Sequence, residues 1–311
     1  MTLGYEQKEC LFCDHHSKLR ELYPQSFKDQ DLTPQIFSAR RQTDHFHYHM
    51  VRCRECGLVF SREVLAPDRL AGLYQDSSVT FEAYQSNLRR DYWKVIGPHL
   101  STVNAGSALE IGCSSGFFLE ELLDHGFQRV AGYEPSAEAK QKASPRVRES
   151  ILTEFFSEPV KAPGKPYDLI CSFHTLDHVL DPAGFVRSCL KALRVGGLCC
   201  MVVHDVDAWQ AKLLGEKSPI IDIQHIYLFN RATLKRLFLQ AGFEVVAVEV
   251  LANSYPLSYW IRMFPIKQRW KDLAEKVLQR LRLSQAAPSL RMGNIAIIAR
   301  APGRSTASER S

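Results

Sequence analysis

From residue 108 to about residue 300, the chain alternates short apolar runs with longer amphipathic segments. The runs are SALEIG, RVAGYE, YDLICSF, GGLCCMVV, FEVVAVEVL and NIAIIAR. Continuous apolar runs are typical of strands buried on both faces, and amphipathic segments between them are typical of covering helices. The pattern therefore predicts an α/β fold, in which helices wrap a largely parallel sheet.

Composition restricts the class of protein further. The chain has 311 residues, of which 45% are hydrophobic and 23% are charged, as in ordinary globular proteins of about two domains. A formal net charge of +5 is too small to indicate a nucleic-acid binder. We find neither an apolar run of about 18 residues nor a basic-then-apolar N-terminus, so we expect a cytoplasmic protein without a membrane span.

Four segments follow from these patterns. Residues 1–62 contain two cysteine pairs, and we expect a small metal-binding module there. Residues 63–104 place aromatic and aliphatic residues at helical spacing, which predicts linker helices. Residues 105–300 form the main domain, and the polar tail 301–311 is predicted to be disordered.

The two cysteine pairs have the spacing of a zinc site. Cys10 and Cys13 form one C-x-x-C pair, and Cys53 and Cys56 form the other, followed by Gly57. Such spacing lets two thiolates reach one tetrahedral ion, and the glycine permits a turn that aims amides at sulfur. Four protein ligands leave no open position, so we predict a structural Zn²⁺ ion.

Other histidines and cysteines are weaker candidates for metal binding. His45, His47 and His49 alternate along an apparent strand, where they are either alternative ligands or one face of a solvated strand. The later cysteines sit in apolar segments, where a free thiol acts as a small hydrophobe; they include Cys171, Cys189, Cys199 and Cys200.

A cofactor site is indicated where the first apolar run ends. The segment after Glu110 is a glycine-rich turn in which Gly112 and Gly116 are spaced G-x-x-x-G. This spacing lacks the pattern of pyrophosphate-binding folds, so it fits a ligand without a pyrophosphate. About twenty residues on, Glu134 ends the second run, where a carboxylate can accept hydrogen bonds from both hydroxyls of a ribose.

These residues resemble the first two motifs of the class I S-adenosylmethionine-dependent methyltransferases. The resemblance covers about residues 105–300 and implies a Rossmann-like seven-stranded methyltransferase sheet with helices on both faces. It also implies which residues bind the cofactor. They are Glu110, Gly112, Cys113, Ser114 and Gly116 around the methionine moiety, Glu134 and Pro135 at the ribose, and Phe173. The segment RCRECGLVF is similar to the cysteine module of bacterial methyltransferases associated with polysaccharide or natural-product pathways.

A second polar cluster follows the run that ends at Phe173. If a helix begins there, His174, Asp177 and His178 stand at positions i, i+3 and i+4 and face one way. Two imidazoles and a carboxylate can bind a divalent ion and leave positions open for substrate. His204 and Asp205, at the end of a later strand, are expected to line the acceptor side.

The same segment resembles the E-x-x-E-H motif of ubiquinone-pathway O-methyltransferases and plant small-RNA 2′-O-methyltransferases. The resemblance implies a divalent cation at His174, Asp177 and His178, with His225 as a downstream ligand. His174 and Asp177 depart from the two glutamates of that motif, so a metal-free site also stays open. In that alternative His178 or His225 is the general base, or His178 only packs a helix.

Residues 254–283 form an insertion before the last run, where we expect the acceptor to be covered. Between residues 262 and 282 this segment has seven basic residues but only two acidic ones, so it contains the whole net charge of the chain. Basic and apolar residues interleave there, which suits a solvated helix, a lid over an anionic acceptor or a helix at a membrane surface that carries a lipid-linked glycan.

Together these features favour O-methylation of a small-molecule or glycan hydroxyl. A nucleotide-sugar C-methyltransferase is the main alternative, because those enzymes share a similar zinc module. An RNA methyltransferase or RNA-binding protein is a weaker alternative, since the basic residues do not gather on the cysteine module.

Overall fold

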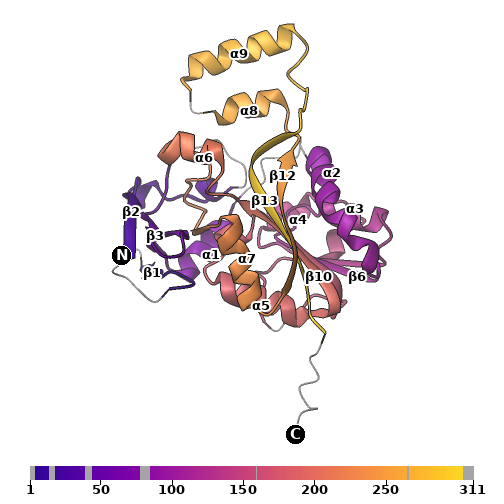
Figure 1. Cartoon of the computed structure of the whole chain (residues 1–311). Helices are drawn as coiled ribbons and strands as arrows, with labels where there is room; N and C mark the ends of the chain where they lie inside the picture. The colour runs from indigo at the N-terminus through magenta and orange to yellow at the C-terminus, as the bar shows by residue number, and fades with distance from the viewer. Residues whose placement is uncertain are drawn as a thin grey trace.

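A computed structural model describes residues 4–13, 18–38, 44–77, 85–158, 160–264 and 266–303. At its centre is a seven-stranded sheet, drawn in Figure 1. Its strand order is β12 (Glu244–Asn253), β13 (Leu290–Arg300), β10 (Leu193–His204), β9 (Tyr167–Phe173), β6 (Ser107–Ile111), β7 (Arg129–Tyr133) and β8 (Ile151–Leu152). Of the predicted disordered tail, residues 304–311 lie outside the described residues.

The sheet confirms the predicted α/β fold. Strand β13 runs antiparallel to both β10 and β12, whereas β10, β9, β6, β7 and β8 pair in parallel. Each of the six predicted runs is a strand. The seventh strand, β8, has only two residues, too few to give a pattern in the sequence.

Alternate residues of each strand pack against opposite layers of helices. Leu198, Cys200 and Val202 of β10 share a core with α2 (Gln85–Ile96) and α3 (Phe117–Asp124). Their neighbours Cys199 and Met201 share a second core with α5 (Pro182–Ala192) and α7 (Arg231–Gln240). Burial on both faces explains why these strands are continuous apolar runs and why their cysteines are buried.

Shorter elements complete the chain. The predicted linker helices are present as α1 (Pro67–Gln75) and α2, and the insertion 254–283 contains α8 (Leu257–Met263) and α9 (Gln268–Arg280). The other helices are α4 (Ala137–Gln141) and α6 (Trp209–Leu214). In Figure 1, α8 and α9 stand apart from the remaining helices, beyond the ends of β12 and β13. No helix among the described residues has the length and apolar character needed to cross a bilayer.

The N-terminal segment is built into the main domain. Strands β1 (Tyr5–Gln7) and β5 (Glu63–Leu65) form a pair, and a second sheet has the order β11 (Tyr227–Leu228), β4 (Val59–Ser61), β3 (Met50–Cys53) and β2 (Leu19–Tyr23). Strand β11 belongs to the later chain, and its Tyr227 ring stacks on Phe60 with centroids 6.0 Å apart. The two parts of the chain therefore share one core cluster.

We expect Phe60→Ala to destabilise the whole chain. Phe60 is fully buried in the shared core, and truncation of a buried phenylalanine costs about 3–5 kcal/mol in the free energy of unfolding. Denaturant unfolding followed by fluorescence and circular dichroism should show one shifted transition. Leu239→Ala, at a residue 51% exposed, should change stability by about 0.5 kcal/mol or less. A separate early transition for the N-terminal segment alone would contradict a shared core.

Candidate functional site

A glycine-rich turn connects β6 to α3. Gly112, Ser114 and Gly116 have positive φ angles of 76°, 49° and 72°. A Cβ atom on Gly112 would lie 2.2 Å from Oγ1 of Thr175, so only glycine fits at this position. The turn thus brings bare backbone close to Thr175, in the loop that follows β9. The predicted cofactor site requires such exposed backbone.

Glu134 follows β7 and faces this turn. Its Oε2 accepts a hydrogen bond from the backbone N–H of Ser114, and its Oε1 accepts one from that of Ser136, each at 2.9 Å. Burial raises the pKa of Glu134, and the two amide hydrogen bonds oppose that rise. Each carboxylate oxygen keeps a further lone pair, so the fixed carboxylate can still accept hydroxyl donors.

Three of the predicted cofactor residues, in or just before this turn, do not reach the cavity. Glu110 is buried, and its Oε2 accepts no hydrogen bond from the described residues. Burial, together with the neighbouring Glu134, raises the pKa of Glu110 well above its usual value. Cys113 is buried in the core beside α3, and Gly116 is the N-cap of that helix. Glu110, Cys113 and Gly116 are therefore absent from the cavity wall, which contains Gly112, Ser114, Glu134, Pro135 and Phe173.

One cavity of about 980 Å³ extends from this turn to a group of histidines. Its wall includes Phe37 and Tyr74 from the N-terminal part, and Trp209, Tyr259 and Trp260 from later helices. Acidic residues contribute to the wall, namely Asp68, Glu134, Glu154, Asp181, Asp205 and Asp222. No lysine or arginine is among the described residues of the wall. The cavity is thus aromatic and acidic, and it is large enough for a cofactor with a small second ligand.

Four histidines stand in a row along one side of the cavity. Ring centroids are 4.7 Å apart between His174 and His204, 4.6 Å between His204 and His225, and 5.0 Å between His225 and His178. His178 Nδ1 is 3.2 Å from the hydroxyl of Tyr74. Burial and the nearby His204 lower the pKa of His225, so this ring is neutral at pH 7.

Asp177 is hydrogen-bonded to His204, one of these four histidines. Its buried Oδ2 accepts hydrogen bonds from Nδ1 of His204 at 2.8 Å and from the backbone N–H of the same residue at 3.1 Å. Its second oxygen, Oδ1, accepts no hydrogen bond from the described residues. A buried carboxylate in this position holds the imidazole in one tautomer, with Nδ1 protonated and Nε2 able to accept a proton.

The prediction that His174, Asp177 and His178 share one face of an α-helix is wrong. Residues Leu176–His178 form a single 3-10 turn, and His174 precedes it with a positive φ of 53°. Because the chain is not α-helical there, the spacing i, i+3, i+4 does not bring the three side chains together. His174 and Asp177 instead have ligand atoms within 4.8 Å of each other and of a ligand atom of His204. Neither His178 nor His225 belongs to that group.

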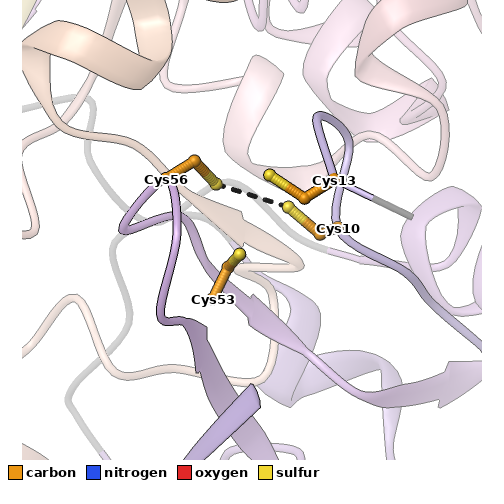
Figure 2. A group of neighbouring side chains, drawn as sticks. All are labelled: Cys10, Cys13, Cys53 and Cys56. Atoms are coloured by element: carbon orange, nitrogen blue, oxygen red, sulfur yellow. Dashed lines mark hydrogen bonds between the residues drawn. The ribbon is translucent and has the colours of Figure 1, made fainter. Parts of the chain in front are cut away.

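The four cysteines meet at the edge of the N-terminal sheet. Figure 2 shows Cys10 and Cys13 on one loop, facing Cys53 at the end of β3 and Cys56 on the turn that follows. The Sγ atoms all lie within 4.8 Å of one another, and those of Cys10 and Cys56 are 3.4 Å apart. Gly57 has a φ of 79°, and the amides of Glu55 and Cys56 donate to Cys53, as the predicted turn requires.

The N-terminal histidines lie outside the cysteine group. His47 is buried, with Nδ1 2.9 Å from the carbonyl oxygen of Tyr48 and Nε2 3.2 Å from Glu216. His49 contacts Glu21. A uniformly solvated face is therefore wrong for His47, which connects the N-terminal segment to the later chain.

Comparison with known proteins gives a family. The model of a family described as a methyltransferase domain matches residues 84–248. A tRNA U34 carboxymethyltransferase of Sulfurovum sp. is 25% identical over 66% of this chain and 67% of its own length. A ubiquinone biosynthesis O-methyltransferase of Serratia proteamaculans is 28% identical over 35% of this chain and 48% of its own length. The chain thus spans about half to two thirds of these relatives.

Among solved structures, an S-adenosylmethionine-dependent methyltransferase from Archaeoglobus fulgidus is 15% identical to this chain. The match covers 71% of this chain and 98% of that one, with a TM-score of 0.48.

Proposed function

Because the chain belongs to the S-adenosylmethionine-dependent methyltransferases of the methyltransferase domain family, we propose that it methylates a hydroxyl group of an uncharged small molecule or glycan. The cavity wall is the observation that carries this proposal. A phosphate group needs cationic or amide partners, whereas the described wall has carboxylates and no lysine or arginine. This argues against both alternatives with phosphate-bearing acceptors, RNA and nucleotide sugars.

The residues near the glycine-rich turn suit the cofactor. Ser114 lines the cavity, and its buried Oγ has no hydrogen-bond partner among the described residues. Glu134 is held by two amides and can accept from the ribose hydroxyls. When bound, S-adenosylmethionine supplies an electrophilic methyl group. The role of the protein is then to orient the acceptor and to remove its proton.

The pair of Asp177 and His204 can remove that proton. Asp177 holds Nδ1–H of His204, which leaves Nε2 as a base, and His204 lines the cavity. As the methyl–sulfur bond of the bound cofactor breaks and the acceptor oxygen takes the methyl group, Nε2 of His204 would accept the hydroxyl proton, and the thioether would be the leaving group. The developing imidazolium is stabilised by the buried carboxylate. His178 and His225 are the bases predicted from the sequence, where His204 is predicted only to line the acceptor side.

A divalent cation is an alternative use of the same residues. His174, Asp177 and His204 have two imidazoles and a carboxylate close enough to share an ion, and Oδ1 of Asp177 lacks a hydrogen-bond donor among the described residues. A cation there would lower the pKa of a bound hydroxyl. The effect of a chelator on activity therefore distinguishes a mechanism with His204 as the general base from one with a bound cation.

We also propose a structural Zn²⁺ ion at Cys10, Cys13, Cys53 and Cys56. Tetrahedral Zn–S bonds of about 2.3 Å put the sulfurs about 3.8 Å apart, which the present group can meet with small shifts. Burial raises the pKa of Cys10 to about 11 and that of Cys56 to about 12, so a cation is needed to keep them as thiolates.

Glu134→Ala should weaken S-adenosylmethionine binding by about 100-fold. Two hydrogen bonds from hydroxyls to a carboxylate are lost, and each is worth about 1.5 kcal/mol or more. Calorimetric titration measures the effect. The matched variant Glu138→Ala, on a partly exposed position of α4, should bind normally. A dissociation constant within threefold of wild type for Glu134→Ala would remove this residue from the cofactor site.

His204→Asn should lower kcat by about 100-fold or more, with little change in cofactor affinity, because a general base contributes about 10²–10⁴ in rate. Activity is measured with phenols and neutral sugars, and with nucleotide sugars and tRNA for comparison. We expect methylation of the neutral hydroxyls only, and full activity for the exposed variant His125→Asn.

Two results would contradict these assignments. Methylation confined to tRNA or nucleotide sugars would overturn the proposed acceptor class. Activity that is lost on mild chelation and restored by Mg²⁺, with zinc retained, would replace the base by a cation at His174, Asp177 and His204.

Cys53→Ser should abolish zinc binding and lower the melting temperature by about 10 °C or more, because metal binding free energy becomes folding free energy. Elemental analysis and a thermal melt test this. The matched variant Cys200→Ala, at a buried thiol of β10, should retain one zinc per chain. Wild-type protein without zinc, folded equally well, would contradict a structural metal.

A further inference from the structure

Helix α9 carries an apolar stripe that faces solvent. Trp270, Leu273 and Val277 of α9 and Leu281, the residue directly after it, are spaced three or four residues apart and are 52%, 51%, 48% and 59% exposed. At about 100° per residue, they fall within one narrow sector of the helix. No residue of α9 is buried, so the inside of the protein does not account for the stripe.

Positive charge borders one edge of this stripe. Arg269, Lys276 and Arg280 lie about 65–105° from the centre of the stripe on the same side, as helical rotation requires. Asp272 and Glu275 lie on the opposite side of the helix, where the carboxylate of Asp272 accepts a hydrogen bond from Gln268. The apolar sector and the basic edge are therefore contiguous, and both acidic residues of α9 point elsewhere.

Helix α8 covers the other edge. Ala274 and Leu278 of α9 are only partly exposed, and Nζ of Lys271 donates to the carbonyl oxygen of Arg262 in α8 at 2.7 Å. Tyr259 of α8 is buried. Figure 1 shows the two helices projecting together from β12 and β13. The hairpin thus holds the stripe and the basic edge outward.

We propose that this hairpin binds the surface of an anionic lipid bilayer, with the stripe at the level of the acyl chain boundary and the basic edge on the headgroups. An exposed amphipathic helix with cations beside its apolar face has the chemistry of an interfacial helix. A second copy of the chain fits less well, because stripe-to-stripe packing would bring like charges together.

The cavity lies next to the hairpin, so docking would affect how the acceptor reaches it. Phe264, just after α8, lines the cavity and is 48% exposed, and Trp260 and Met263 of α8 also line it. Docking would therefore bring the mouth of the cavity to the lipid surface. An acceptor that dissolves in or is anchored to the membrane would enter directly. This consequence rests on the proposed function, whereas docking itself does not.

Vesicle sedimentation tests the docking. The 311-residue chain should bind vesicles of phosphatidylglycerol and phosphatidylcholine, and bind pure phosphatidylcholine at least about tenfold more weakly. Leu273→Gln/Val277→Gln should weaken binding to the anionic vesicles at least about tenfold. The matched control Leu239→Gln replaces a leucine of equal exposure on α7 and should bind within about twofold of wild type.

Charge reversal gives a second arm of the test. Arg269→Glu/Lys276→Glu should also lose at least about tenfold in binding to anionic vesicles, and added salt should reduce the wild-type binding. Each variant should bind S-adenosylmethionine normally in calorimetry, which confirms that it is folded.

Three outcomes would overturn the proposal. They are no vesicle binding by wild type, binding that the α9 variants leave unchanged, and a wild-type dimer in sedimentation equilibrium that Leu273→Gln/Val277→Gln dissociates. None of these measurements depends on methyl transfer, so a failure of the proposed function would leave this test intact.

Discussion

Parallel pairing of four neighbouring strands is the constraint on which the site depends. Because β7, β6, β9 and β10 run the same way, their carboxyl ends meet at one edge of the sheet. Gly112, Glu134, His174 and His204 each lie at such an end. Residues far apart in sequence thus reach one cavity, and the antiparallel β13 lies next to β10 in the same sheet.

Sequence reasoning succeeded where the physical signal is local. Burial on both faces makes a strand apolar throughout, a positive φ demands glycine at Gly112, and an acidic residue at a strand end is visible at Glu134. It failed where contacts join the ends of neighbouring strands. His204 bonds to Asp177, 27 residues away, and no periodicity reports that pairing. The helical spacing assumed for His174 and His178 was overruled by the left-handed backbone at His174.

The distribution of charge separates two surfaces with different partners. Cations of the insertion stand on the exposed hairpin, whereas the described cavity wall carries carboxylates and aromatic rings. Net charge alone could not distinguish these places, since +5 is a sum over the chain. Their separation is consistent with a neutral acceptor inside and an anionic surface outside.

The shared core of the N-terminal segment has an evolutionary consequence. Phe37 and Tyr74 of the N-terminal part line the same cavity as Gly112 and Glu134 of the main domain. A substitution at Phe37 or Tyr74 can thus change the cavity wall while Gly112 and Glu134 stay the same. Acceptor selectivity can therefore diverge during evolution while the residues at the cofactor stay the same. Because β4 of the N-terminal segment pairs with β11, exchange of this segment between proteins would also require matching residues in β11.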